Sequence, residues 1–519
     1  MREVSASYNP FPVVRSPGVT LTFQKLAIAL PKNKITVSSS APAVVNQSKL
    51  IVDGINEIGK KYATLERYGW NLDGSCSIMP ESGAERGVWY NRISNSSGTL
   101  SSSITLTCTL PVSIETLGWT FHFDDPTGIY SPEVQAICYN ANDEEIDNYT
   151  GTLEDHTRDG EGWWLTRTVA QYKKVSFKFT RLNEGYRYFR MAEIEFGIAR
   201  SFDTNSIASM SITQEATLDG SALPAKKLVF EFDNSKREFN LLNPVEVYQF
   251  WRSGQGISAA ITLGDDSVDM GLFFISRAEI GKNSLTAKVT AYDEVLQLGS
   301  ALYDPGALAQ SQSVTLRTAV ESILNGYMLE IDCNGLDDEP VSLQIETTHE
   351  KRAVLALVAQ AARATVWIDR DSTVQIVRPA IKQTADAELT ADQLYDWRGV
   401  EFTEEVKSVT LTVSREVEGA DTETYTAGSA AYGENTAEYS NPCVAPGKGQ
   451  DVADWLLVMA NWAKRYAVRN RCDPAVEIGD TLKIADVFGN DENAFVTGLD
   501  VSFNGTLSAN TKAAGEFNA

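Results

Sequence analysis

Three histidines are the first residues to consider for catalysis, because imidazole is the commonest general base near neutral pH. They are His122, His156 and His349, and no string typical of hydrolase nucleophiles, phosphate-binding loops or zinc proteases accompanies them. His122 lies on an alternating apolar stretch, and His349 lies where a helix is expected to begin. Structural or exposed roles are therefore favoured, and the sequence predicts no catalytic residue and no enzyme activity.

Neighbouring carboxylates could hydrolyse a glycosidic bond if they were held at the right separation. The candidates are Asp124 with Asp125, and Glu144 with Glu145, but 69 acidic residues make such neighbours common by chance. The oxygen donors of Asn140, Asn142 and Asp143 could hold calcium, although their spacing is not that of an EF-hand loop. Solvated turns are favoured for all of these residues, so we expect no metal site and no cofactor.

Two adjacent tryptophans give the sharpest binding hypothesis. Trp163 and Trp164 follow a loop-like stretch that contains Arg158 and Asp159. In a loop, an indole ring could stack on a sugar while Arg158 or Asp159 bonds its hydroxyl groups. On a strand, one indole must face the core and the other must face outward. The four residues are a candidate carbohydrate site, and simple packing of either tryptophan is the alternative.

Bulk composition limits the class of protein. The 519 residues are enough for roughly three to five domains, and a hydrophobic content of 43% supports packed cores. A net charge of −24 repels phosphate backbones, which argues against nucleic-acid binding over the outer surface. No run of 18 apolar residues occurs and the first residues do not resemble a signal peptide, so we expect folding in a cytoplasm.

The six cysteines are scattered, without a Cys-x-x-Cys pair or a nearby histidine at metal-site spacing. We expect them to be buried thiols in a reducing compartment. A pair among Cys76, Cys108 and Cys138 is left open, because all three fall in one predicted β domain.

Most of the chain alternates with a period of two. The stretches 104–110, 119–123, 134–139 and 175–179, with turn clusters between them, favour a β-sandwich or jelly roll over 62–199. The pattern continues over 206–299. Residues 301–385 predict a small α/β domain, with a capping box from Thr347 to Glu350 at the start of one helix. Apolar positions from Val452 to Tyr466 fall at helical spacing, which predicts a helix over 451–468.

Several strings resemble known tail proteins of phages and prophages. Tyr62–Gly74 and Tyr186–Gly197 resemble the edges of discoidin-like β-sandwiches in tail proteins from phages of Gram-positive bacteria. Further along the chain, three groups of strings resemble the first and closing barrels of tail hub proteins: Leu223–Asn234 with Phe239–Pro244 and Gly254–Gly256, Met270–Ile275 with Ala291–Asp293, and Arg471–Asp480. In the last string, Cys472 stands where the resemblance leads us to expect glycine.

The resemblance implies a mainly β fold with α+β parts: two hub-type β-barrels, a small α/β domain and an inserted discoidin-like jelly-roll sandwich. The expected boundaries are an N-terminal arm with part of the first barrel (1–61), the sandwich (62–199), the first barrel (200–300), the α/β domain (301–385) and the second barrel (386–519).

The implied function is that of a structural hub protein of a phage or phage-like tail tip or baseplate. The expected partners are two further copies in a homotrimeric ring, the distal tail or tail tube protein, the tape measure protein and distal fibre or receptor-binding proteins. DNA would only pass through the lumen, and the location would be the virion tail, assembled in the host bacterial cytoplasm. The alternative is a carbohydrate-binding adhesion module that attaches to a cell-surface glycan.

Overall fold

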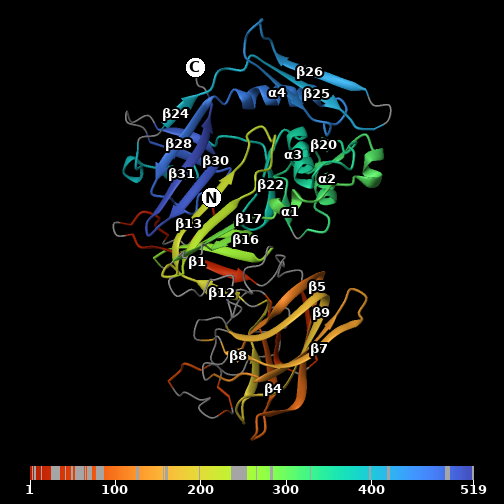
Figure 1. Cartoon of the computed structure of the whole chain (residues 1–519), viewed down its shortest axis with the longest axis vertical. Coiled ribbons are helices and arrows are strands. Elements are labelled where there is room, and N and C mark those ends of the chain that lie inside the picture. Colours follow the sequence, from red (N-terminus) through yellow and green to blue (C-terminus); the bar gives the residue numbers. More distant parts are fainter. Residues whose placement is uncertain are drawn as a thin grey trace. The chain divides into compact units, whose positions relative to one another are not determined.

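A computed structural model of the chain forms two compact units (Figure 1). One consists of Met1–Leu21 with Phe202–Ala519, and the other of Thr22–Ser201. The structure describes residues 1–24 (except 3, 5–7, 13 and 14), 35–40, 43–47, 51–52, 63–64, 66, 73–76, 87–123, 128–155, 157, 162–197, 199–234, 254–264, 266–280, 285–327, 329–396, 399–417, 421–485 and 491–516.

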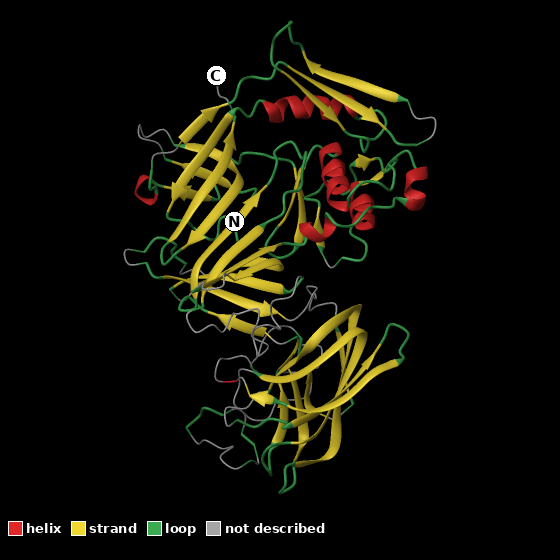
Figure 2. Ribbon diagram, in the orientation of Figure 1, coloured by secondary structure: helices red, strands yellow, loops and turns green. Residues whose placement is uncertain are grey.

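The larger unit, Met1–Leu21 with Phe202–Ala519, is built on one curled sheet of 13 strands, yellow in Figure 2. Its main path runs β12-β1-β15-β16-β17-β14-β13-β30-β31-β28-β24, and β23 and β29 pair beside β30. The strand bounds are β1 Pro17–Gln24, β12 Ala199–Phe202, β13 Ile207–Glu215, β14 Lys227–Asp233, β15 Gly256–Leu263, β16 Asp266–Ile280, β17 Thr286–Tyr292, β23 Ala387–Leu389, β24 Gly399–Phe402, β28 Lys464–Asn470, β29 Thr481–Ile484, β30 Glu492–Phe503 and β31 Leu507–Gly515.

This sheet forms because its strands alternate buried and exposed side chains. In β14, for example, Leu228, Phe230 and Phe232 are fully buried while the residues between them are not. The strands predicted for two separate barrels are joined by the antiparallel pair β13–β30, in which Met210 lies opposite Phe503. The predicted mainly β architecture with an α/β part is confirmed, and the strands of both predicted barrels belong to one continuous sheet.

The small α/β part packs its helices on a short sheet of order β19-β22-β21. Its elements are α1 Val295–Leu298, β18 Val314–Thr315, α2 Leu316–Ile323, β19 Glu330–Asp332, β20 Pro340–Val341, α3 Lys351–Ala361, β21 Thr365–Ile368 and β22 Thr373–Val377, with a 3₁₀ turn at Gly306–Gln310. The predicted capping box is wrong. The N-cap of α3 is Glu350 itself, with no side-chain capping bond, and its carboxylate bonds Arg352 instead.

A second small sheet of order β26-β25-β27 is covered on one face by helix α4. The bounds are β25 Ser408–Ser414, β26 Thr422–Gly428, β27 Thr436–Ser440 and α4 Gly449–Ala460, and a 3₁₀ turn lies at Ala391–Gln393. Figure 1 shows α4 running alongside β25 and β26. Each of β26 and β27 pairs only with β25 among the described residues, so each leaves one edge open.

The predicted helix over 451–468 is too long. The side chain of Asn461 bonds Val406 and the carbonyl of Leu457, which ends the helix. The chain then enters strand β28, where Tyr466 and Val468 are buried and Ala467 and Arg469 are exposed. Ala463 and Tyr466 are spaced as on one face of a helix, but Tyr466 and Val468 are spaced as on one face of a strand, and pairing with β31 and β24 decides for the strand.

The smaller unit, Thr22–Ser201, is a β-sandwich. A seven-stranded sheet (path β11-β5-β9-β6-β7, with β2 on β5 and β8 on β9) is accompanied by a three-stranded sheet β10-β4-β3. The bounds are β2 Thr36–Ser39, β3 Ala43–Gln47, β4 Gly87–Ile93, β5 Thr99–His122, β6 Glu133–Tyr139, β7 Glu145–Thr152, β8 Glu154–Asp155, β9 Trp163–Arg181, β10 Tyr188–Met191 and β11 Glu193–Phe196. The unit begins at Thr22, not at residue 62, because β2 and β3 pair with its strands.

Buried aromatic rings fill the core of the sandwich. The ring of Phe177 packs edge to face against those of Trp119 and Phe121, with ring centroids 5.3 and 5.0 Å apart. Cys108 and Cys138 both lie opposite Val175, on the two strands that flank β9. Two strand spacings, about 9.6 Å, separate these cysteines, which is too far for a disulfide. They are free thiols.

Among the described residues, no helix has the length and apolar character needed to cross a membrane.

Candidate functional site

The histidines lie in structural settings. His349 Nε2 is 2.8 Å from Glu416 Oε2, and the same carboxylate accepts the N–H of Glu346, so the contact fastens the start of α3 to the chain after β25. His122 is buried at the end of β5, with Nε2 3.6 Å from Glu195. His156 lies outside the described residues, as do Asp124 and Asp125.

Five of the six thiols are poor nucleophiles. Burial raises the pKa of Cys138 to about 12 and that of Cys333 to about 11. Burial also raises the pKa of Cys108, Cys443 and Cys472. Each therefore stays protonated near neutral pH, whereas nucleophilic attack requires the thiolate.

The turn considered for calcium is closed by its own bonds. Asn140 Oδ1 accepts the N–H groups of Asn142 and Glu144, at 2.9 and 3.1 Å. Asp143 forms an ion pair with Lys174. A cation would have to displace these donors. Among the described residues, no group of three His, Cys, Asp or Glu side chains is placed to hold a metal ion.

The two tryptophans of the candidate carbohydrate site both lie on β9. Trp163 is half-buried and stacks on Tyr130, with ring centroids 3.5 Å apart and planes inclined by 10°. Trp164 faces the opposite side of the strand and is 6% exposed. Arg158 and Asp159 lie outside the described residues. The structure thus adds Tyr130, which the sequence analysis missed because nothing in the local pattern links it to a tryptophan 33 positions away.

The two strings that mark the sandwich in the sequence meet in space. Glu66, from the opening string, accepts the backbone N–H of Tyr188 at 2.8 Å and forms an ion pair with Arg190, both in the closing string. The guanidinium of Arg190 also lies over the ring of Trp89, 4.3 Å from its centroid. These contacts fasten the two strings to each other.

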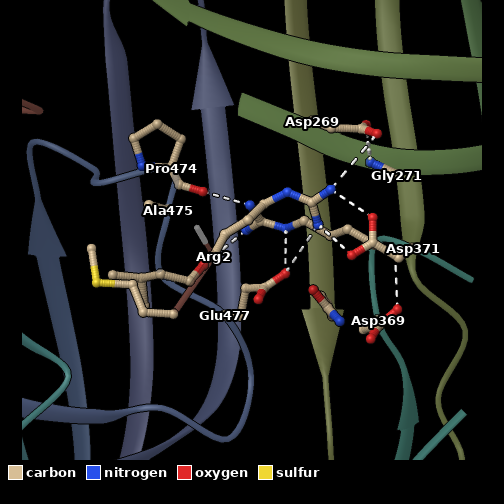
Figure 3. Close-up of polar contacts among 12 residues, drawn as sticks. Arg2, Asp269, Gly271, Asp369, Asp371, Pro474, Ala475 and Glu477 are labelled. Atoms are coloured by element: carbon tan, nitrogen blue, oxygen red, sulfur yellow. Dashed lines mark hydrogen bonds and ion pairs between the residues drawn. The ribbon is translucent and has the colours of Figure 1, made fainter. Parts of the chain in front are cut away.

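A polar cluster of the larger unit, which we call the N-terminal junction, is centred on Arg2 (Figure 3). Its guanidinium bonds both carboxylate oxygens of Asp371, at 2.7 and 3.2 Å. Glu477 and Asp269 lie farther away, at 3.6 and 3.9 Å. Burial lowers the pKa of Arg2, but the bond to Asp371 and the charges of the three carboxylates outweigh it, so the net shift is upward. The backbone N–H of Arg2 donates to Ala475.

A second arginine fastens the turn between β21 and β22 to the stretch from Arg471 to Asp480. Arg370 is 4% exposed and donates to the carbonyls of Pro474 and Val476. Its Nε lies 3.7 Å from Glu477, the carboxylate that also faces Arg2. The first residues of the chain add further bonds to this stretch: the amino group of Met1 to Asp480, and Tyr8 Oη to Asp473 at 2.7 Å.

A buried lysine connects the same turn to β14 and β17. Lys226 Nζ donates to the carbonyl of Asp369 at 3.2 Å and is 2% exposed. It fits because Gly271 has no side chain: a Cβ there would lie 2.8 Å from Nζ, and φ at Gly271 is +106°. Asp293, opposite Lys226, is also buried, and burial raises its pKa to about 7 against the opposing charge of Lys226.

The junction therefore fastens together four segments that are distant in sequence: the first residues, β16, the β21–β22 turn and the stretch from Arg471 to Asp480. Two of these segments contain strings singled out from the sequence: Met270–Ile275, which lies in β16, and Arg471–Asp480. Arg2 was missed, because an arginine near a chain end carries no pattern. Cys472 adopts φ +64°, the left-handed conformation that glycine takes most easily, which is consistent with the glycine that the resemblance led us to expect there. Such a cluster of donors and carboxylates, bonded to one another, is suited to fastening these segments together.

The chain was compared with protein families, curated sequences and solved structures. No protein-family model and no curated protein sequence matches the chain. The solved structures that it resembles include tail proteins of prophages. A tail protein from Neisseria meningitidis is 10% identical with a TM-score of 0.44, covering 60% of this chain and 93% of that protein. The 43 kDa tail protein of prophage MuSo2 from Shewanella oneidensis is 13% identical with a TM-score of 0.44, covering 60% and 95%.

A prophage tail protein from Listeria monocytogenes is 10% identical with a TM-score of 0.38, covering 62% of this chain and 92% of that protein. Tail proteins are the class that the sequence strings resemble. The discoidin-like resemblance of the smaller unit stays a prediction. At these identities and TM-scores the likeness is distant, so the role of this chain is inferred from its own residues.

Proposed function

We propose that this chain is a structural hub protein of a phage or phage-like tail tip or baseplate. Three copies would form a ring that closes the tail tube and connects it to distal host-binding parts. The distal tail or tail tube protein and the tape measure protein would bind on one side, and fibre or receptor-binding proteins on the other. DNA would cross only the lumen, and assembly would take place in the host bacterial cytoplasm, before the protein resides in the virion tail.

The observation that carries this proposal is a continuous curled sheet fastened at the N-terminal junction and flanked by open strand edges. Strand β26, seven residues long, pairs on one side only among the described residues, and Thr422, Thr424 and Thr426 on it are exposed. An unpaired edge of this length, without proline or lysine to block it, favours pairing with another chain. The acidic surface keeps unassembled copies soluble, since net charge of one sign opposes random association.

Hydrogen exchange in solution tests the edge directly. On assembly, the outward N–H groups of β26 gain carbonyl partners, so amide exchange over 422–428 is expected to slow at least tenfold between dilute monomer and concentrated oligomer. The neighbouring strand β25 is already paired on both sides and is the internal control. Equal exchange of 422–428 in both states would remove β26 from the interface.

A second candidate function, a carbohydrate-binding adhesion module, is favoured by the stacked pair of Tyr130 and Trp163. A partly exposed aromatic surface at the end of a sandwich suits a sugar ring, whose C–H groups pack on π-faces. The test is a cell-wall glycan pull-down with the full chain. Trp163→Ala is expected to abolish binding, while Trp164→Phe, on the opposite face of β9, retains it. Glycan binding that survives Trp163→Ala would exclude this site.

A further inference from the structure

A cavity of about 270 Å³ lies in the larger unit, between the end of α4, the turn after β13 and the strands β28, β30 and β31. Its polar wall is made by Asp219, Tyr439 and Arg465, and Leu218 and Met459 contribute apolar wall. These residues come from segments far apart in the sequence. The volume is just below the roughly 300–1,000 Å³ of ordinary small-molecule sites, so the cavity suits a compact ligand.

Arg465 supplies a half-buried cation whose charge is not matched by a close carboxylate. Its Nη1 donates to the carbonyl of Trp462, and no carboxylate of the described residues lies within 4.0 Å of it. Burial lowers its pKa, and Asp219 is the acid that opposes this shift. A guanidinium carries five N–H donors in a planar fork that matches a carboxylate. Donors therefore remain for an anion in the cavity.

Another part of the lining favours a positive group. Asp219 Oδ1 accepts from the N–H and hydroxyl of Ser221, and among the described residues Oδ2 accepts only from Tyr439, at 3.3 Å. Burial raises the pKa of Tyr439 to about 12, so its hydroxyl keeps the proton that it donates to Asp219. Ala460, the last residue of the 12-residue helix α4, also lines the cavity. The carbonyl end of a helix attracts positive charge.

We propose that this cavity binds a small zwitterion of amino-acid size. Its carboxylate pairs with Arg465, its ammonium group lies toward Asp219 and the end of α4, and a short aliphatic part packs on Leu218 and Met459. This site is independent of the proposed tail function, and its failure would leave that proposal untouched.

Calorimetry with the full chain tests the proposal, using L-alanine, acetate and methylammonium as separate probes at constant ionic strength. L-alanine is expected to bind saturably, at least tenfold more tightly than either half-ligand. Arg465→Gln is expected to weaken L-alanine binding at least tenfold. Asp219→Asn is expected to weaken L-alanine while leaving acetate unchanged. The matched control is Arg469→Gln, on the same strand but exposed and paired with Asp396, which leaves binding unaltered.

Two results would overturn the proposal. In the first, Arg465→Gln lowers thermal stability while wild-type protein binds none of the probes, which would mean that Arg465 only caps α4 through Trp462. In the second, acetate binds as tightly as L-alanine and Asp219→Asn changes nothing. If Arg465→Gln does not fold, Leu218→Phe provides an independent variant: it narrows the cavity and is expected to block L-alanine binding, and unchanged binding would contradict the site.

Discussion

Arg2 gives the most direct test of the N-terminal junction. Removing its charge with Arg2→Gln breaks a two-pronged bond to Asp371, whose distances are 2.7 and 3.2 Å. The Arg2 side chain is 17% exposed and that of Asp371 is 66% exposed. A hydrogen bond to a charged group contributes about 1.5–3 kcal/mol, and a fully exposed ion pair about 0.2–1 kcal/mol. This pair lies between the two cases, so we expect a coupling energy of about 1–1.5 kcal/mol.

The assay is a double-mutant cycle of Arg2→Gln and Asp371→Asn, read as the opening free energy of the 471–480 stretch by native-state hydrogen exchange. A local readout is needed because two units can unfold separately. The comparison pair is Arg277 with Glu279, 2.7 Å apart but 73% and 52% exposed, for which we expect a coupling of about 0.2–0.5 kcal/mol. Molar salt is expected to reduce the Arg2 coupling. A coupling no larger than that of the comparison pair would refute the fastening role of Arg2.

Three further predictions concern buried groups. Asp293→Asn is expected to stabilise the larger unit at pH 8 but not at pH 4, by at most about 2–4 kcal/mol. The folded chain holds the proton of the Asp293 carboxyl more tightly than the unfolded chain does, because its pKa is raised from 3.8 to about 7. The wild-type protein therefore loses this contribution to its stability as the pH rises through 7. Glu66→Gln is expected to destabilise the sandwich by about 3–5 kcal/mol in urea, because it removes the carboxylate charge from a buried ion pair with Arg190. Cys108 and Cys138 are expected to resist iodoacetamide until the sandwich unfolds, as mass spectrometry would show.

Each of these has a control and a contradicting outcome. Asp304→Asn, at an exposed turn, should leave the pH dependence unchanged, and an identical pH profile for Asp293→Asn would disprove the effect of burial. Lys174→Gln breaks an exposed pair of the sandwich and should cost less than about 0.5 kcal/mol; an equal cost for Glu66→Gln would contradict a buried pair. Rapid alkylation of native Cys138 would show that its thiol is accessible.

Local patterns predicted what local physics decides. The alternation in β14 and β9 follows from the backbone and burial preferences of a few neighbouring residues, whereas the glycine expected at Cys472 came from the resemblance to tail hub proteins. The predicted helix over 451–468 failed at Asn461 because a side-chain bond to Val406, 55 positions away, ended it. Spacing alone carries no information about such a partner.

The long-range features were beyond reach of the sequence for the same reason. The pairing of β13 with β30 joins residues almost 300 positions apart, and register between distant strands leaves no trace in either strand alone. The N-terminal junction and the cavity at Arg465 each collect single charged residues from separate segments. The adjacent tryptophans could be identified in the sequence. The stacking of Tyr130 on Trp163 depends on the position of β9 in the fold and could not.

The solution mass of the chain tests the proposed threefold ring most directly. Native mass spectrometry of the full chain at micromolar concentration is expected to give a species of three times 56.9 kDa. A mass of 56.9 kDa that persists at the highest soluble concentration would contradict the ring.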